Sequence, residues 1–116
     1  MPSATVTPMN RSIEHTTTIL LPARFDVHEV AGFEARITQQ ASWATVVILD
    51  ASNVKYLDGA AIASLLKARL RCLDLNGDLA IAAPSAATRI ILELAGRYEA
   101  LNPIETGPIE ELKAAA

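Results

Sequence analysis

Residues 46–66 decide the fold of this chain, and they read VVILDASNVKYLDGAAIASLL. The first four residues are apolar and mostly β-branched, which is typical of a strand buried on both faces inside a helix-covered sheet. A polar loop follows, and apolar residues then recur at helical spacing from a start near Asp58. A strand, a loop and a helix in direct succession predict an α/β domain.

The same alternation extends through the rest of the chain. We predict strands over residues 12–21, 46–49 and 79–82, a short strand over 101–104, and helices that begin near Asp26, Asp58, Ser85 and Pro108. The Asp and Ser side chains can accept hydrogen bonds from a first helical turn, and proline suits a first helical position. We therefore expect one α/β domain over residues 12–113, with a four- to five-stranded mixed sheet and about four helices. Residues 1–11 are expected to be a flexible end or an edge strand.

Composition excludes several classes of protein. The 116 residues are 51% hydrophobic and carry a formal net charge of −3, which excludes intrinsic disorder and a basic nucleic-acid-binding surface. The apolar stretches are too short to span a membrane, and residues 1–10 lack the pattern of a signal peptide. The single cysteine, Cys72, cannot form an internal disulfide and is expected to be in the core or half-buried. We expect a cytoplasmic domain without direct membrane insertion.

No motif for catalysis is present in the sequence. The five glycines are isolated, so the glycine-rich loops of dinucleotide and P-loop sites are missing. His15, His28 and Cys72 lie in different predicted elements, and no serine has the flanking glycines of a nucleophile elbow. We therefore expect neither an enzyme nor a bound cofactor or metal.

The predicted helix start at Asp58 is the most informative local feature. An aspartate at this position caps the helix by accepting a backbone N–H, and that role alone explains its presence. The next three residues, Gly59, Ala60 and Ala61, carry almost no side chain. Exposed backbone with a partial positive charge is therefore open to close approach by a partner. Capping of the helix by Asp58 and contact with a partner at the helix start are compatible roles.

Several motifs in the right order resemble the STAS domain family, which includes anti-sigma factor antagonists and the tails of sulfate transporters. LDAS (49–52) is similar to the family's L-D-L-S, and LD (57–58) before an apolar helix is similar to the residues around its D-S-S-G-L motif. GDLAI (77–81) resembles the strand after the second helix, RIILELAG (89–96) the ending R-x-x-L-E-L-T-G, and LPARFD (21–26) the G-x-L-D turn, with Ala23 in place of glycine. The resemblance covers about residues 12–113 and implies a STAS-like single domain.

For function, the resemblance implies partner switching. Antagonists of this family bind an anti-sigma factor of the histidine-kinase-like ATPase fold, which releases the sigma factor. The same partner phosphorylates the second serine of D-S-S-G, and the added charge ends the binding. In this chain Asp58 is followed by Gly59, Ala60 and Ala61, so the acceptor position is Ala60, which has no hydroxyl. The nearest hydroxyls are Ser52 in the loop and Ser64, which we expect on the solvated face of the helix.

The predicted function is therefore a protein-binding regulator that resembles an anti-sigma factor antagonist and lacks a phosphoserine switch at Ala60. Its predicted partner-binding residues are Asp26, Asn53, Asp58, Gly59, Ala60, Ala61 and Ser64. Two alternatives remain open. One is a small STAS subunit of a lipid-transporting ABC complex, bound to the ABC ATPase. The other is a small-ligand sensor with a cavity lined by residues such as Trp43 or Tyr98.

Overall fold

The computed structural model describes residues 15–104. Our predictions for residues 1–11 and for a helix beginning at Pro108 lie outside the described residues. The elements in chain order are β1 (His15–Leu20), β2 (Arg24–Phe25), α1 (Val27–Gln40), β3 (Thr45–Asp50), β4 (Tyr56–Leu57), α2 (Gly59–Asp74), β5 (Asp78–Ala82), α3 (Ala86–Leu94) and the 3-10 helix η2 (Glu99–Leu101). The predicted α/β class is confirmed.

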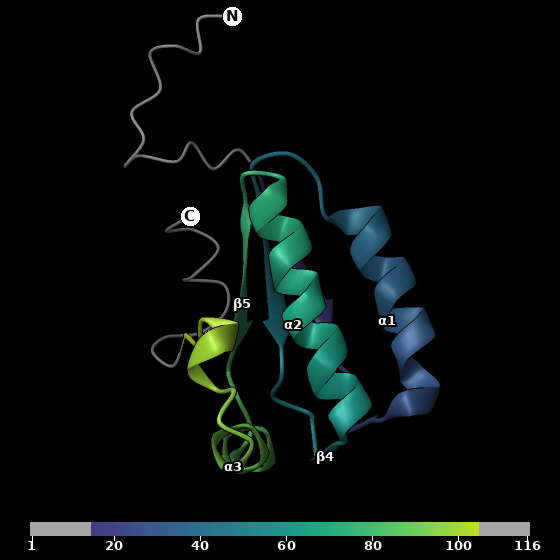
Figure 1. The fold of residues 1–116 in the computed structure, drawn as a ribbon, viewed down its shortest axis with the longest axis vertical. Coiled ribbons are helices and arrows are strands. Elements are labelled where there is room, and N and C mark those ends of the chain that lie inside the picture. The colour runs from purple at the N-terminus through teal and green to yellow at the C-terminus, as the bar shows by residue number, and fades with distance from the viewer. Residues whose placement is uncertain (1–14, 105–116) are drawn as a thin grey trace, which may run out of the picture.

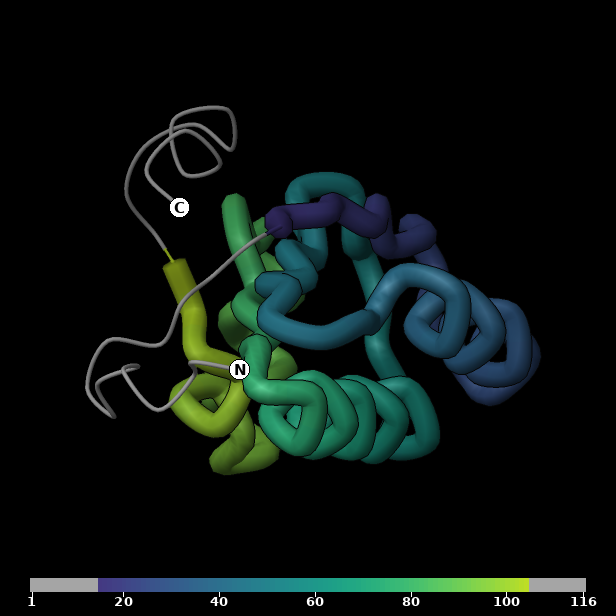
Figure 2. The backbone as a smooth tube through the Cα atoms, turned by 90° about the horizontal axis from the view of Figure 1, so that it is seen from above, coloured from purple at the N-terminus to yellow at the C-terminus, as the bar shows by residue number. Residues whose placement is uncertain are grey.

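The described strands form two parallel sheets. β1, β3 and β5 lie in that order in the larger sheet, and β2 pairs with β4 in the smaller one. α1 connects β1 to β3, and α2 connects β3 to β5. Crossovers of the same hand, stepping in one direction across a sheet, place their helices on the same face. α1 and α2 accordingly lie side by side along one side of the strands (Figures 1 and 2).

The core lies between these two helices and the sheet. Register places Ile19 beside Leu49, and Leu49 beside Ile81, so one row of large side chains crosses all three strands on the helix side. Each of these three side chains is fully buried. α1 contributes Phe33 and Ile37 to the same cluster. Alternation along each strand therefore fixes which face receives the helices.

The buried face of α2 does not include all of its large apolar side chains. Its buried residues are Ala61, Ser64, Leu65, Ala68 and Cys72, whereas Leu70 is 64% exposed. Most of these buried side chains are small, which lets α2 pack closely against the sheet and leaves a groove on the side that faces α1. Residue size, rather than hydrophobicity alone, sets the rotation of this helix.

The predicted short strand over residues 101–104 is largely absent. Leu101 is the last residue of η2. Of the four residues predicted as a strand, only Ile104 forms a parallel bridge, and its partner is Ala82. The physical reason is local: Asn102 has a φ of 53°, and Pro103 has no N–H to donate to a neighbouring strand. Of residues 101–104, Ile104 alone therefore joins the sheet edge.

The amino edge of the sheet, where α1 and α2 lead into β3 and β5, is formed by tight backbone turns. Ala44 and Asn76 adopt left-handed φ values of 57° and 62°, and the Ala44 N–H donates to the Leu75 carbonyl at 2.9 Å. A Cβ atom at Gly77 would overlap the backbone of Thr45. Gly77 is therefore required for the close approach of two chain segments.

Candidate functional site

The candidate site lies at the carboxyl edge of the sheet, where two equivalent turns meet. The strand β2 ends at Phe25 and β4 ends at Leu57, and these two buried residues are paired in parallel register. Each is followed directly by an aspartate, Asp26 or Asp58, and then by a helix. The pairing of two short strands thus brings the starts of α1 and α2 together (Figure 1).

Asp58 caps both helices with one carboxylate. Its Oδ1 accepts from the Ala61 N–H at 2.9 Å, within the first turn of α2. Its Oδ2 accepts from the Val27 N–H, also at 2.9 Å, at the first residue of α1. The N-cap role is the predicted one, and the bond to α1 is an additional link between segments far apart in the sequence.

Asp26 is held by local contacts. Its Oδ1 accepts from the His28 N–H at 2.9 Å, as expected of an N-cap, and its Oδ2 accepts from Arg24 Nε at 3.0 Å. Burial acts to raise the pKa of Asp26, but the hydrogen bonds from Arg24 and the His28 backbone outweigh it and leave this pKa below its ordinary value. Asp26 therefore stays ionised beside the two helix starts.

The loop between β3 and β4 is fixed by hydrogen bonds from several directions. Ser52 donates to Asp50 Oδ1 through both its N–H, at 3.0 Å, and its Oγ, at 2.7 Å. Ser85, which caps α3 as predicted, also donates its Oγ–H to the Val54 carbonyl at 2.6 Å. Asn53, at the tip of this loop, is exposed. The loop thus presents Asn53 from a rigid support.

The seven predicted partner-binding residues divide by accessibility. Gly59 is exposed and Ala60 is half-buried, so both can be reached from solvent. Ala61 is fully buried, and its methyl group packs in the core. The expectation that Ser64 lies on a solvated helix face is wrong: it is 4% exposed, and its Oγ donates to the Ala61 carbonyl at 2.8 Å. The cause is the rotation of α2 toward α1.

Three exposed apolar residues beside these turns escaped the sequence reasoning. Leu20, Val27 and Tyr56 are 48%, 57% and 41% exposed, and the Arg24 guanidinium lies 5.0 Å from the centre of the Tyr56 ring. The sequence contains one indication of their exposure, because each of them is an apolar residue next to a turn. Their exposure depends on the pairing of β2 with β4, which spans only two residues per strand.

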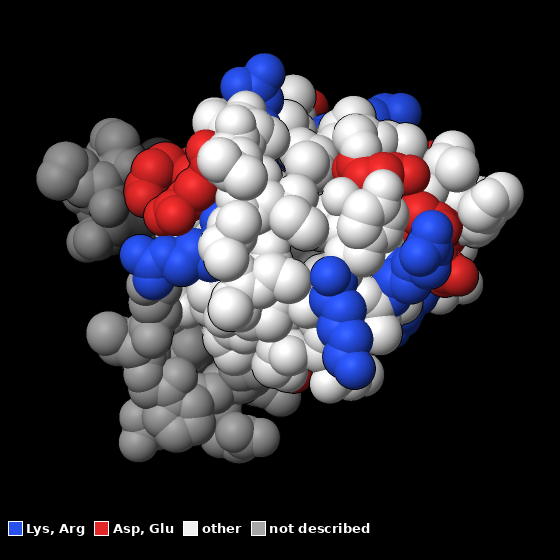
Figure 3. All heavy atoms as spheres, turned by 90° about the horizontal axis from the view of Figure 1, so that it is seen from below, with Lys and Arg blue, Asp and Glu red and all other residues white. Residues whose placement is uncertain are grey.

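We call the exposed and half-buried residues Val27, Asn53, Tyr56, Gly59 and Ala60 the helix-start surface. The view from below shows this end of the molecule with uncharged atoms over much of its surface and with basic and acidic side chains among them (Figure 3). Exposed backbone together with aromatic and aliphatic side chains suits contact with another protein, and Arg24 and Lys55 add positive charge beside them.

Potential metal ligands do not cluster within residues 15–104. No group of three or more His, Cys, Asp or Glu side chains in this range could hold a metal ion. Cys72 is buried as predicted, and burial raises its pKa to about 11, so the thiol is protonated at neutral pH. None of the described helices is long and apolar enough to cross a bilayer.

The two aromatic residues considered for a ligand cavity do not form one together. Trp43 is 61% exposed, whereas Tyr98 is 4% exposed and lies under the Arg89 guanidinium, 5.5 Å from its ring centre. Neither residue lines the groove between α1 and α2 or the hollow beside the end of β1. A ligand cavity at either residue stays a prediction.

Comparison with known proteins assigns the family. The STAS domain family model matches residues 7–107, so this chain belongs to the STAS domain family. No curated protein sequence shows significant similarity to it.

Several solved structures that are described as anti-sigma factor antagonists have a fold similar to that of this chain. An anti-sigma-factor antagonist (STAS) domain protein from Planctomyces limnophilus superposes with a TM-score of 0.69 at 21% identity, over 85% of this chain and 90% of that chain. The anti-sigma factor antagonist SpoIIAA in its unphosphorylated form gives 0.68 at 18% identity, over 90% and 91%. The phosphorylated form of SpoIIAA from Bacillus gives 0.64 at 19% identity, over 86% and 91%. The chain is therefore a STAS domain that resembles these antagonists in fold.

Proposed function

We propose that this STAS domain is a non-enzymatic, cytoplasmic regulator of the anti-sigma factor antagonist kind. In this proposal it binds an anti-sigma factor of the histidine-kinase-like ATPase fold through the helix-start surface, and the sigma factor is released. The fold shared with SpoIIAA supports this class of function.

One observation carries the proposal: two helix starts lie side by side, and the small residues Gly59 and Ala60 form the accessible first turn of α2. Gly59 has open space around its Cβ position, and Ala60 adds only a methyl group. A partner can therefore approach the backbone of the first turn of α2. Asp26 and Asp58 lie directly behind this backbone and hold it in place.

The proposal includes the loss of the phosphoserine switch. Alanine at position 60 cannot accept phosphate, and Ser64 is buried, with its hydroxyl bonded to the Ala61 carbonyl. Ser52 is exposed, but its hydroxyl donates to Asp50, and a phosphate there would face a carboxylate. In this proposal, binding to the partner is therefore controlled by something other than a phosphoserine at position 60.

The decisive experiment measures the affinity between the full chain and the candidate anti-sigma factor by calorimetry. Ala60→Asp places a negative charge on the helix-start surface and is expected to weaken binding by at least about tenfold, the effect of roughly 1.4 kcal/mol. The helix itself tolerates an acidic residue in its first turn. Ala35→Asp, the same substitution at an exposed position in the middle of α1, serves as the control and is expected to leave affinity unchanged.

Equal affinities for the wild type and Ala60→Asp would count against the helix-start surface as the binding site. A second variant, Ala60→Ser, tests the partner. With ATP present, a kinase-like partner is expected to transfer phosphate to the introduced hydroxyl, which mass spectrometry detects.

A second candidate function is a subunit of a lipid-transporting ABC complex. The absence of a hydroxyl at Ala60 favours it, because such a subunit needs no phosphoserine. The two candidates differ in the protein that co-purifies: a histidine-kinase-like ATPase or an ABC ATPase.

A further inference from the structure

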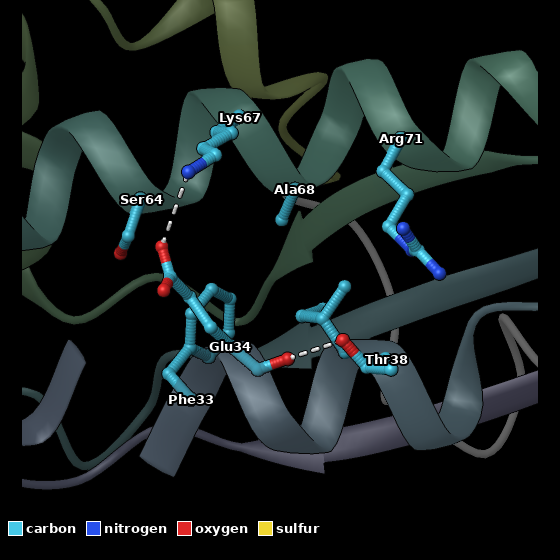
Figure 4. Close-up of a pocket in the computed structure, with 8 residues that line it drawn as sticks. Phe33, Glu34, Thr38, Ser64, Lys67, Ala68 and Arg71 are labelled. Atoms are coloured by element: carbon cyan, nitrogen blue, oxygen red, sulfur yellow. Dashed lines mark hydrogen bonds and ion pairs between the residues drawn. The ribbon is translucent and has the colours of Figure 1, made fainter. Parts of the chain in front are cut away.

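A groove of about 240 Å³ runs between α1 and α2, away from the helix-start surface. α1 contributes Phe33, Glu34, Ile37 and Thr38 to it, and α2 contributes Ser64, Lys67, Ala68 and Arg71. Figure 4 shows the facing side chains of the two helices, with Ala68 pointing into the space between Lys67 and Arg71. The groove is therefore bordered by two cations from one helix.

Small residues on α2 create this space. Ser64 and Ala68 lie one turn apart on the side of α2 that faces α1, and both are almost fully buried. Phe33 and Ile37 of α1 are also buried and belong to the core cluster beneath. The groove consequently has an apolar floor of aromatic, aliphatic and methyl groups.

The rim of the groove has more positive than negative charge. Lys67 Nζ lies 3.7 Å from Glu34 Oε2, and the two side chains are 77% and 46% exposed, so this ion pair is loose and weak. Within residues 15–104, no carboxylate lies within ion-pair distance of Arg71. A guanidinium presents a planar set of donors that matches a carboxylate with two parallel hydrogen bonds.

The hydroxyl groups of the groove are already used as donors. Ser64 Oγ donates to the Ala61 carbonyl at 2.8 Å, and Thr38 Oγ1 donates to the Glu34 carbonyl at 3.0 Å. Both oxygens can still accept a bond, but neither offers a free proton to a ligand. The strong donors available to a ligand are therefore the ammonium of Lys67 and the guanidinium of Arg71.

Size limits the ligand to a small molecule. The groove's volume of about 240 Å³ is below the roughly 300–1,000 Å³ of pockets that hold drug-sized ligands. We propose that the α1–α2 groove binds a small monocarboxylate with an apolar body. The carboxylate pairs with Arg71 and Lys67, and the apolar body lies over Ala68 and Phe33. This site is separate from the proposed docking of a protein partner and does not depend on it.

The test uses phenylacetate as the probe and the full chain in solution. Two-dimensional NMR titration is expected to show saturable shifts of backbone amide signals in residues 33–38 and 64–71, with a Kd on the order of 1 mM for so small a ligand. Phenylacetamide has the same shape without the charge, and it is expected to bind at least about tenfold more weakly.

Two kinds of variant locate the site. Arg71→Gln removes the guanidinium at an exposed position and is expected to weaken phenylacetate binding by about tenfold. Arg36→Gln, which removes an exposed arginine of α1 that does not line the groove, is the matched control and is expected to leave the Kd unchanged. Ala68→Leu fills the groove and is expected to abolish binding.

The proposal is overturned if phenylacetate gives no saturable shifts in these two segments. It is equally overturned if phenylacetamide binds as well as phenylacetate, or if Arg71→Gln binds with the affinity of the wild type. Ala68→Leu changes a buried residue, so its spectrum is first compared with that of the wild type to establish folding. If it is unfolded, the exposed Lys67→Gln replaces it, and an unchanged Kd for that variant also contradicts the proposal.

Discussion

The two edges of the sheet are stabilised in different ways. At the amino edge, Gly77 packs against the backbone of Thr45, and Ala44 and Asn76 adopt left-handed conformations. At the carboxyl edge, the carboxylates of Asp26 and Asp58 hold the starts of α1 and α2. Backbone shape determines the first edge, and side-chain hydrogen bonds determine the second.

This difference supports the proposal that the carboxyl edge binds a partner. A turn fixed by a backbone overlap tolerates almost no substitution, because any Cβ atom would have to displace the neighbouring chain. A turn fixed by side-chain caps leaves its other positions open, so residues such as Gly59 and Ala60 can vary without loss of the helix. The residues in front of the caps are therefore available for recognition.

The largest effect is expected at the amino edge. Gly77→Ala should lower the free energy of unfolding by about 3 kcal/mol or more, since its Cβ would overlap backbone atoms of Thr45. Urea denaturation measures the loss. Gly32→Ala is the matched control: nothing lies near its Cβ position in α1, and alanine should raise stability by about 0.8 kcal/mol. Similar values for the two variants would contradict the steric role of Gly77.

A smaller effect is expected for the shared cap at the carboxyl edge. Asp58→Ala removes one hydrogen bond to α2 and one to α1, and a lost N-cap typically costs about 1 kcal/mol, so we expect a loss of about 2 kcal/mol. Urea denaturation again gives the value. Asp26→Ala, which loses its cap on α1 alone together with an Arg24 contact, should cost less. A larger loss for Asp26→Ala would show that the bond to Val27 contributes little.

Acid should weaken the carboxyl edge through Asp26. Because the pKa of Asp26 is lower in the folded than in the unfolded chain, the carboxylate stabilises the fold above the ordinary value of 3.8. That contribution is lost as the pH falls below this value and through the folded pKa. The thermal unfolding temperature of Asp26→Asn should therefore change less between pH 5 and pH 2 than that of the wild type. Parallel curves for the two proteins would contradict this assignment.

The smallest effect is expected for Asn76→Gly. Asparagine tolerates the φ of 62° at this position better than most residues, and glycine tolerates it without strain. We expect the free energy of unfolding to change by no more than about 0.5 kcal/mol, which chemical denaturation can measure. A loss of more than 1.5 kcal/mol would indicate a role for the Asn76 side chain beyond its backbone conformation.

Local chemistry allowed much of the fold to be predicted from sequence. The caps at Asp26, Asp58 and Ser85 follow from residue type beside an apolar periodic run, and the structure confirms all three. The central strand was predicted as residues 46–49 and is observed as Thr45–Asp50. Signals of this kind depend on neighbouring residues, so they can be recognised without knowledge of tertiary packing.

The features that escaped prediction depend on contacts between distant segments. The pairing of β2 with β4 involves only two residues of each strand, which is too short for any period to register. The burial of Ser64 follows from the rotation of α2 against α1, and the groove arises from the small residues at that contact. The bond between Val27 and Asp58 joins two turns that sequence reasoning treated separately.

The double cap at Asp58 has a consequence for the motions of the protein. Val27 and Ala61 donate their N–H groups to opposite oxygens of one carboxylate. Rotation of that single side chain releases both amides, so α1 and α2 fray in the same opening event rather than one by one. A contact that changes the orientation of Asp58 should therefore change the hydrogen-exchange rates of the Val27 and Ala61 amides in the same direction. A partner that binds at the start of α2 would in this way also alter the stability of the start of α1.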